Sequence, residues 1–164
     1  MKTKTQIYKQ IIDEETATSV FDFLLNNGQW EDGIYSKRLK RVTRKAYSPD
    51  LNNMDSTVDL MIMDLLIQCF NKLNLTEKYL ISDIYVNYYR NGQDSAPSHS
   101  HPGQTQLVLS LGTTRTLIVG NKHYNVENGD VIIFGSSTHQ VPQELHITTP
   151  RISIATFMVN KNSI

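Results

Sequence analysis

The chain has few of the features that mark secreted, membrane-spanning or strongly charged proteins. Its 164 residues include one cysteine, Cys69, so no disulfide can form within the chain and a reducing compartment is favoured. Sixteen basic and sixteen acidic residues leave no net charge, so any attraction to nucleic acid or membrane must be local. No apolar run approaches the roughly 18 residues of a membrane span.

Organisational signals are also scarce. The first residues, MKTKTQIYKQIID, contain lysines but lack the apolar core of a signal peptide. Repeats, low-complexity tracts and linkers are absent, and the hydrophobic content of 39% suits one compact domain. We therefore expect a single cytoplasmic domain, 1–164, with an N-terminal part of about 1–80 and a C-terminal part of about 81–160.

Two helices are predicted in the N-terminal part. In DEETATSVFDFLLNN, apolar residues recur at helical spacing, Asp13 suits the N-cap and Gly28 ends the helix. A second helix is predicted from about Ser56 to Leu73, with Cys69 on its buried side.

Between the predicted helices lies a basic segment, KRLKRVTRK, at residues 37–45. Two interpretations stay open: a solvated edge strand guarded by charge, or a lid that contacts the phosphates of a nucleic acid. The candidate nucleic-acid-binding residues are Lys37, Arg38, Lys40, Arg41, Arg44 and Lys45.

The C-terminal part changes to short segments rich in β-branched and aromatic residues, separated by Gly, Asn and Pro turns. Examples are ISDIYVNYYR, TQLVLSLG, TRTLIVG, HYNV, GDVIIFG and RISIATFMV. Many short strands without helices between them indicate an antiparallel sandwich or barrel. The predicted fold is therefore α+β: a double-stranded β-helix, or jelly roll, with two N-terminal helices packed on one side.

Three of the five histidines form a pattern that suits a metal. In an extended segment, His99 and His101 point to the same face, and His139 follows 38 residues after His101. A pair on one strand with one distant histidine fits a metal site that keeps open coordination positions. Spacing alone is also compatible with a surface pair. His123 and His146 have no such pattern and are expected on the surface.

Two further pairs share a strand face in the same way. Asn87 and Tyr89 face one side of the strand that leads towards His99, and Arg151 and Ser153 share a face of the last strand. A guanidinium on a rigid strand suits a bidentate grip on a carboxylate, although a pairing with a surface acid is the simpler alternative.

The order of these residues resembles the AlkB-like family of iron(II)- and 2-oxoglutarate-dependent dioxygenases, in its nucleic-acid repair branch. The resemblance covers about residues 84–157 and rests on Asn87, Tyr89, Gly92, His99, SLG at 110–112, Gly129-Asp130, His139 and Arg151-Ile152-Ser153. It implies that His99 and His139 bind iron(II), that Arg151 anchors the distal carboxylate of 2-oxoglutarate, and that Asn87, Tyr89 and Ser153 help to hold this co-substrate. O2 would be the second co-substrate, and the reaction would hydroxylate or demethylate a base of a single-stranded nucleic acid or a nucleotide, as in DNA repair.

The chain departs from the family at two positions. His101 stands where the family has Asp, so three histidines form the predicted ligand set, which also suits zinc, nickel or copper. Phe157 stands where the family has a second arginine. If His101 were instead the first ligand, the motif would be His-Pro-Gly, as in related halogenases, but the fit at Asn87 favours His99.

Two alternatives to a nucleic-acid enzyme therefore stay open. The same chemistry can act on a protein side chain or a small molecule. The chain can also be a non-catalytic jelly roll that binds metal or nucleic acid and has lost the family Asp.

Overall fold

The structure is a computed structural model that describes residues 3–164. Met1 and Lys2, which belong to the predicted domain 1–164 and to the N-terminal stretch without a signal-peptide core, lie outside the described residues. Neither of the two helices among residues 3–164 is long and apolar enough to cross a membrane.

Both predicted helices are confirmed, α1 (Glu14–Asn27) and α2 (Thr57–Lys72), and their ends follow from capping. The Asp13 carboxylate accepts a hydrogen bond from the Thr16 N–H, at 2.9 Å, and the Gly28 N–H donates to the Leu24 carbonyl. At the second helix, Ser56 Oγ accepts from the N–H of Asp59 at 3.1 Å.

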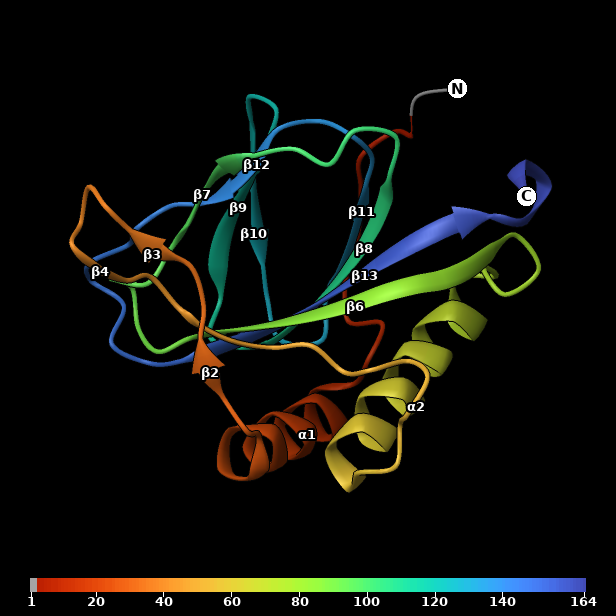
Figure 1. Cartoon of the computed structure of the whole chain (residues 1–164), viewed down its shortest axis with the longest axis horizontal. Helices are drawn as coiled ribbons and strands as arrows, with labels where there is room; N and C mark the ends of the chain where they lie inside the picture. The colour runs from red at the N-terminus through yellow and green to blue at the C-terminus, as the bar shows by residue number, and fades with distance from the viewer. Residues whose placement is uncertain (1–2) are drawn as a thin grey trace.

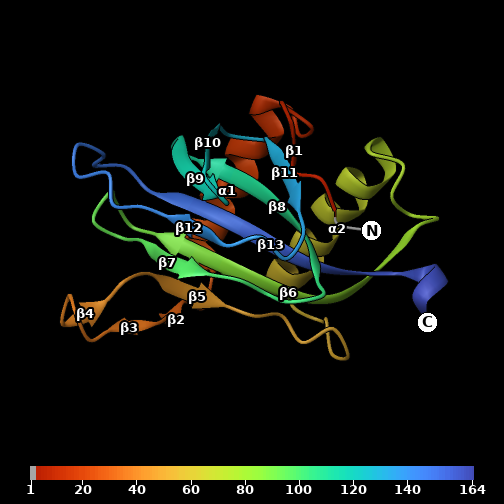
Figure 2. The same cartoon turned by 90° about the horizontal axis from the view of Figure 1, so that it is seen from above.

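The strands form two main antiparallel sheets. The large sheet has the order β1-β11-β8-β13-β6-β5-β2, the small sheet has the order β10-β9-β12-β7, and β3 and β4 form a separate hairpin. Figure 1 shows both helices under the large sheet, and the view from above in Figure 2 shows β12 and β7 of the small sheet lying over β13 and β6. The α+β class is thereby confirmed. The strands are β1 (Gln6–Tyr8), β2 (Glu31–Asp32), β3 (Tyr35–Ser36), β4 (Arg41–Val42), β5 (Lys45–Tyr47), β6 (Tyr79–Tyr89), β7 (Ala96–His99), β8 (Thr105–Gly112), β9 (Arg115–Val119), β10 (Lys122–Val126), β11 (Val131–Phe134), β12 (His139–Val141) and β13 (Arg151–Asn160), followed by a 3-10 turn at Lys161–Ser163.

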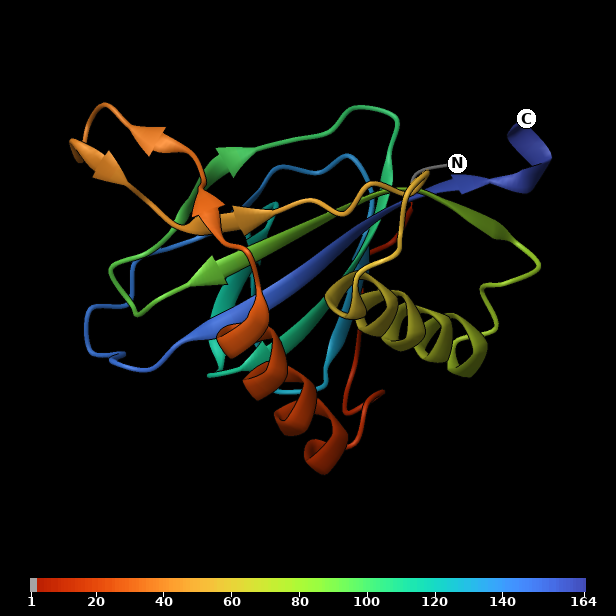
Figure 3. The ribbon, with the colours of Figure 1, turned by 60° about the horizontal axis from the view of Figure 1, so that its bottom comes forward.

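The N-terminal part is less helical than the sequence suggested. It also contributes β1, which pairs with β11, and β5, which pairs with β6 at the other side of the large sheet. These two strands have three residues each, too few for a recognisable alternation, so only their pairing partners define them. Figure 3 shows the β3–β4 hairpin projecting beyond the body of the sheets.

Strand β13 separates two apolar cores. Ile152 and Ile154 pack into the core between the large sheet and the helices. A second core, containing Val108, Phe134 and Val141, lies between the two sheets. Because side chains alternate along a strand, Arg151 and Ser153 point to the second side, where the sheets leave a pocket between them.

Candidate metal centre and pocket

The pairing of β7 with β12 brings the predicted histidines together. His139 is the register partner of His99, and His101 follows two residues after the end of β7. The candidate ligand nitrogens of the three all lie within 4.8 Å of one another. Tetrahedral metal bonds of about 2.1 Å hold two ligand nitrogens about 3.4 Å apart, so a shift of about 1 Å in each side chain would close this three-histidine cluster around an ion.

Backbone carbonyls orient two of the three imidazoles. His99 Nδ1 lies 2.7 Å from the Pro97 carbonyl oxygen, and His139 Nδ1 lies 3.2 Å from the Ser137 carbonyl oxygen. In this arrangement each Nδ1–H donates to a carbonyl, which leaves Nε2 as the free lone pair for a metal. The cluster therefore has the hydrogen-bonding support that is usual for histidine ligands.

Burial favours the neutral form of two of the three imidazoles. It lowers the pKa of His139 to about 4, and burial, together with the neighbouring His99, also lowers the pKa of His101. Neutral imidazole is the form that binds a metal. His101 additionally packs edge-on against Phe157, with ring centroids 5.0 Å apart. Phe157 thus supports the imidazole of His101.

Arg151 is a buried cation with an unsatisfied donor. It is 1% exposed, its Nε donates to Ser110 Oγ at 2.8 Å, and its Nη1 has no hydrogen-bond partner. Within residues 3–164, no carboxylate oxygen lies within 4.0 Å of its guanidinium. Burial lowers the pKa of Arg151 to about 10, so it remains protonated at neutral pH.

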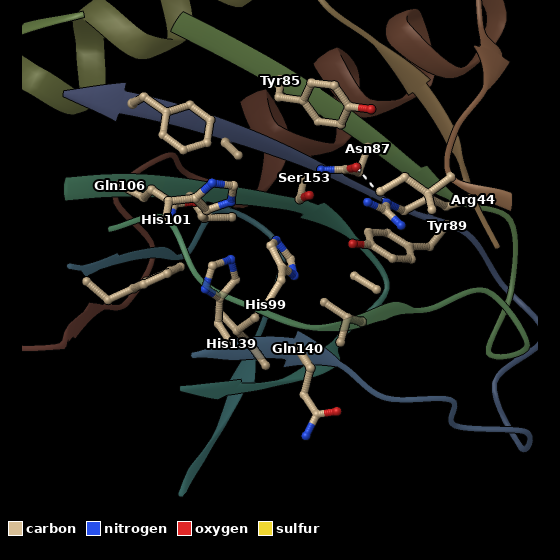
Figure 4. Close-up of a pocket in the computed structure, with 18 of the residues that line it drawn as sticks. Arg44, Tyr85, Asn87, Tyr89, His99, His101, Gln106, His139, Gln140 and Ser153 are labelled. Carbon is tan, nitrogen blue, oxygen red and sulfur yellow. Dashed lines mark hydrogen bonds between the residues drawn. The ribbon is translucent and has the colours of Figure 1, made fainter. Parts of the chain in front are cut away.

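One cavity of about 410 Å³ joins these groups. The register of the central strands explains why, because Arg151 pairs with Tyr89 and Ser153 pairs with Asn87, which places all four side chains on one face. Figure 4 shows His99 and His139 on one side of this pocket and Asn87, Tyr89 and Ser153 on the other. All seven predicted metal- and co-substrate-binding residues line the cavity: His99, His101, His139, Asn87, Tyr89, Arg151 and Ser153.

The basic segment is divided by the fold. Lys37, Arg38 and Lys40 are exposed in the turn between β3 and β4. Arg41 pairs with Asp94 at 3.2 Å, and Lys45 pairs with Asp32. Arg44 is buried in the pocket wall.

Several residues in and around the pocket are not among the predicted metal- and co-substrate-binding residues. Arg44 is predicted as part of the basic segment, either a solvated edge strand or a phosphate-contacting lid, whereas its Nε donates to the Asn87 side-chain oxygen at 2.8 Å. Gln106 and Ser110 lie on β8, which pairs with β13, and their alternation along a recognised strand is the signal that was available. Only the pairing of β8 with β13 puts them beside Arg151 and Phe157.

Comparison with known protein families and with curated protein sequences finds no match. Solved structures do resemble the chain. A Trichoplax adhaerens prolyl hydroxylase in complex with a hypoxia-inducible factor peptide fragment has a TM-score of 0.68 at 16% identity, covering 96% of this chain and 84% of that chain. A Pseudomonas putida prolyl-4-hydroxylase has a TM-score of 0.56 at 14% identity, covering 94% and 91%.

A third similar structure is the non-haem α-ketoglutarate-dependent epimerase SnoN from nogalamycin biosynthesis. Its TM-score is 0.66 at 10% identity, covering 94% of this chain and 77% of that chain. At these identities the likeness is one of fold, and it extends over nearly the whole chain. The chain therefore shares its fold with these three structures.

Proposed function

We propose that the chain is a 2-oxoglutarate-dependent non-haem metal oxygenase, whose two sheets form a double-stranded β-helix. The observation that carries the proposal is Arg151, a buried guanidinium with a free Nη1 that shares one cavity with three convergent histidines. A buried cation without a counter-ion is costly, and a carboxylate ligand would remove that cost. The ordered motif from Asn87 to Ser153 and the fold of the similar structures support the same proposal.

The chain's own residues would divide the work as follows. His99, His101 and His139 hold the metal, and the carbonyls behind His99 and His139 keep Nε2 directed towards it. Arg151 binds the distal carboxylate of 2-oxoglutarate. Bound iron(II) would supply the activation of O2, coupled to decarboxylation of 2-oxoglutarate, for oxidation of a C–H bond.

For the substrate we propose a small molecule or a protein side chain in place of a nucleic-acid base. The basic segment has fewer free positive charges for a phosphate backbone than its composition suggested, because Arg44 is buried and Arg41 and Lys45 already pair with acidic residues. The similar structures also include a hydroxylase bound to a peptide and a biosynthetic epimerase.

Metal binding and turnover test this proposal together. Protein loaded anaerobically with iron(II) should release succinate from 2-oxoglutarate when O2 is admitted, and His139→Ala should not. Iron(II) titrated in a calorimeter should bind the parent protein and neither His99→Ala nor His139→Ala. Full iron(II) binding by both variants would rule out the proposed metal site. Metal binding without 2-oxoglutarate binding would favour a non-catalytic metal-binding jelly roll.

A further inference from the structure

The buried arginines of this chain are of two kinds. Arg115 is 1% exposed and pairs with Glu144, at 3.2 Å between Nε and Oε1. Arg44 is 4% exposed and Arg151 is 1% exposed, and in the described part of the chain neither has a carboxylate within 4.0 Å. Both of these uncompensated cations line the same cavity.

The bonds of Arg44 hold it in place without neutralising it. Its Nε donates to Asn87 Oδ1 at 2.8 Å, and its Nη1 lies 3.4 Å from both Thr43 Oγ1 and the Ser95 carbonyl oxygen. All three acceptors are neutral. Figure 4 shows the guanidinium between Asn87 and Tyr89, across the pocket from His101. A positioned, desolvated guanidinium of this kind is a receptor for an oxyanion.

The charges around the pocket leave room for one more anion. The candidate ligand set consists of three imidazoles, which add no negative charge. The charges of a divalent ion and of dianionic 2-oxoglutarate cancel each other. Among the described lining residues, the two positive charges of the arginines then outnumber the one negative charge, that of exposed Asp83. An enclosed excess of positive charge favours an anionic partner.

We infer that Arg44 is a specificity-determining residue that binds a carboxylate or phosphate group of the substrate, so that the pocket takes a small anionic substrate beside 2-oxoglutarate. This inference rests on the proposed function. It assigns the two uncompensated arginines to two different anions, Arg151 to the co-substrate and Arg44 to the substrate.

The test uses acetate and inorganic phosphate as probes of the anion site. Protein loaded with zinc, which does not turn over, and saturated with 2-oxoglutarate is titrated with each probe while its thermal unfolding midpoint is followed. Acetamide serves as the neutral counterpart of acetate, and sodium chloride matches the ionic strength. The midpoint should rise with acetate or phosphate and not with acetamide, and the probe with the lower dissociation constant identifies the group that Arg44 binds.

Three variants separate Arg44 from the rest of the pocket. Arg44→Gln should raise the dissociation constant of the probe at least tenfold and leave the affinity for 2-oxoglutarate unchanged. Arg44→Lys should retain part of the probe affinity because it keeps the charge. Arg38→Gln, on the exposed β3–β4 turn, is the matched control and should bind the probe like the parent.

Three outcomes would overturn the inference. In the first, neither probe shifts the midpoint of the parent protein. In the second, Arg44→Gln weakens 2-oxoglutarate instead of the probe, which would make Arg44 part of the co-substrate anchor. In the third, ligand-free Arg44→Gln is strongly destabilised while its probe affinity is unchanged, which marks a purely structural arginine. If 2-oxoglutarate binds neither the parent protein nor any variant, the proposed function fails. A probe-induced rise of the unfolding midpoint that depends on Arg44 would in that case still support the anion site.

Discussion

Replacing Arg151 with methionine should separate ligand binding from stability. The substitution keeps a long side chain but removes the guanidinium, with its free Nη1 and its bond to Ser110. Each hydrogen bond to a charged group is worth about 1.5–3 kcal/mol, so a bidentate carboxylate grip loses at least about 3 kcal/mol. That loss corresponds to an increase of about 100-fold in the dissociation constant of 2-oxoglutarate. Arg151→Lys keeps the charge and loses the planar fork, so its affinity should fall about tenfold, or about 1.4 kcal/mol.

Stability should respond in the opposite way. Without ligand, Arg151→Met removes a buried cation that has no carboxylate partner within residues 3–164, so the free energy of unfolding should stay nearly constant or rise. Arg115→Met is the matched control, because it removes a buried arginine that pairs with Glu144 and donates to the carbonyls of Asn91, Asp94 and Pro142. Breaking such a pair costs about 3–5 kcal/mol.

The assay is calorimetric titration of zinc-loaded protein with 2-oxoglutarate, alongside urea unfolding of the ligand-free variants. Unchanged co-substrate affinity in folded Arg151→Met would refute the assignment of this residue. A loss of several kcal/mol in its unfolding free energy would show that the guanidinium has a structural role that its contacts do not reveal.

Four further substitutions test the metal site, two glycine positions and the basic segment. His101→Asp should lower metal affinity 10- to 100-fold in a competition assay, because the pocket packs around an imidazole, and a tighter or faster Asp variant would instead indicate a degenerate family site. Gly92→Ala should prevent folding or cost more than about 4 kcal/mol, since a Cβ there would lie 1.7 Å from the Glu144 carbonyl oxygen. Gly103→Ala, with open space around it but a φ of +75°, should cost only about 1–2 kcal/mol by urea unfolding. Lys40→Ser should leave the salt dependence of any oligonucleotide binding unchanged, whereas a lid over single-stranded nucleic acid would lose about 0.7 in slope for each phosphate contact removed.

Local features of the sequence determined the elements and part of the site. Capping by Asp13 and Ser56 defines helix starts within a residue or two, because the caps bond to the N–H groups of the first turn. Alternation along the last strand separates Arg151 from Ile152, which is a property of any extended chain. The i, i+2 spacing of His99 and His101 likewise predicts that they share a face, and their rings lie 5.0 Å apart.

The tertiary structure alone decided what faces these residues. His139 lies opposite His99 only because β12 pairs with β7, and nothing within either three- or four-residue strand specifies that register. Arg44 looked like its basic neighbours, yet it is buried against Asn87 while Arg41 pairs with Asp94. Burial and charge pairing depend on which distant segments pack together. A local pattern can therefore show that a guanidinium is present, but only the packed fold determines whether a carboxylate of the chain or a ligand neutralises it.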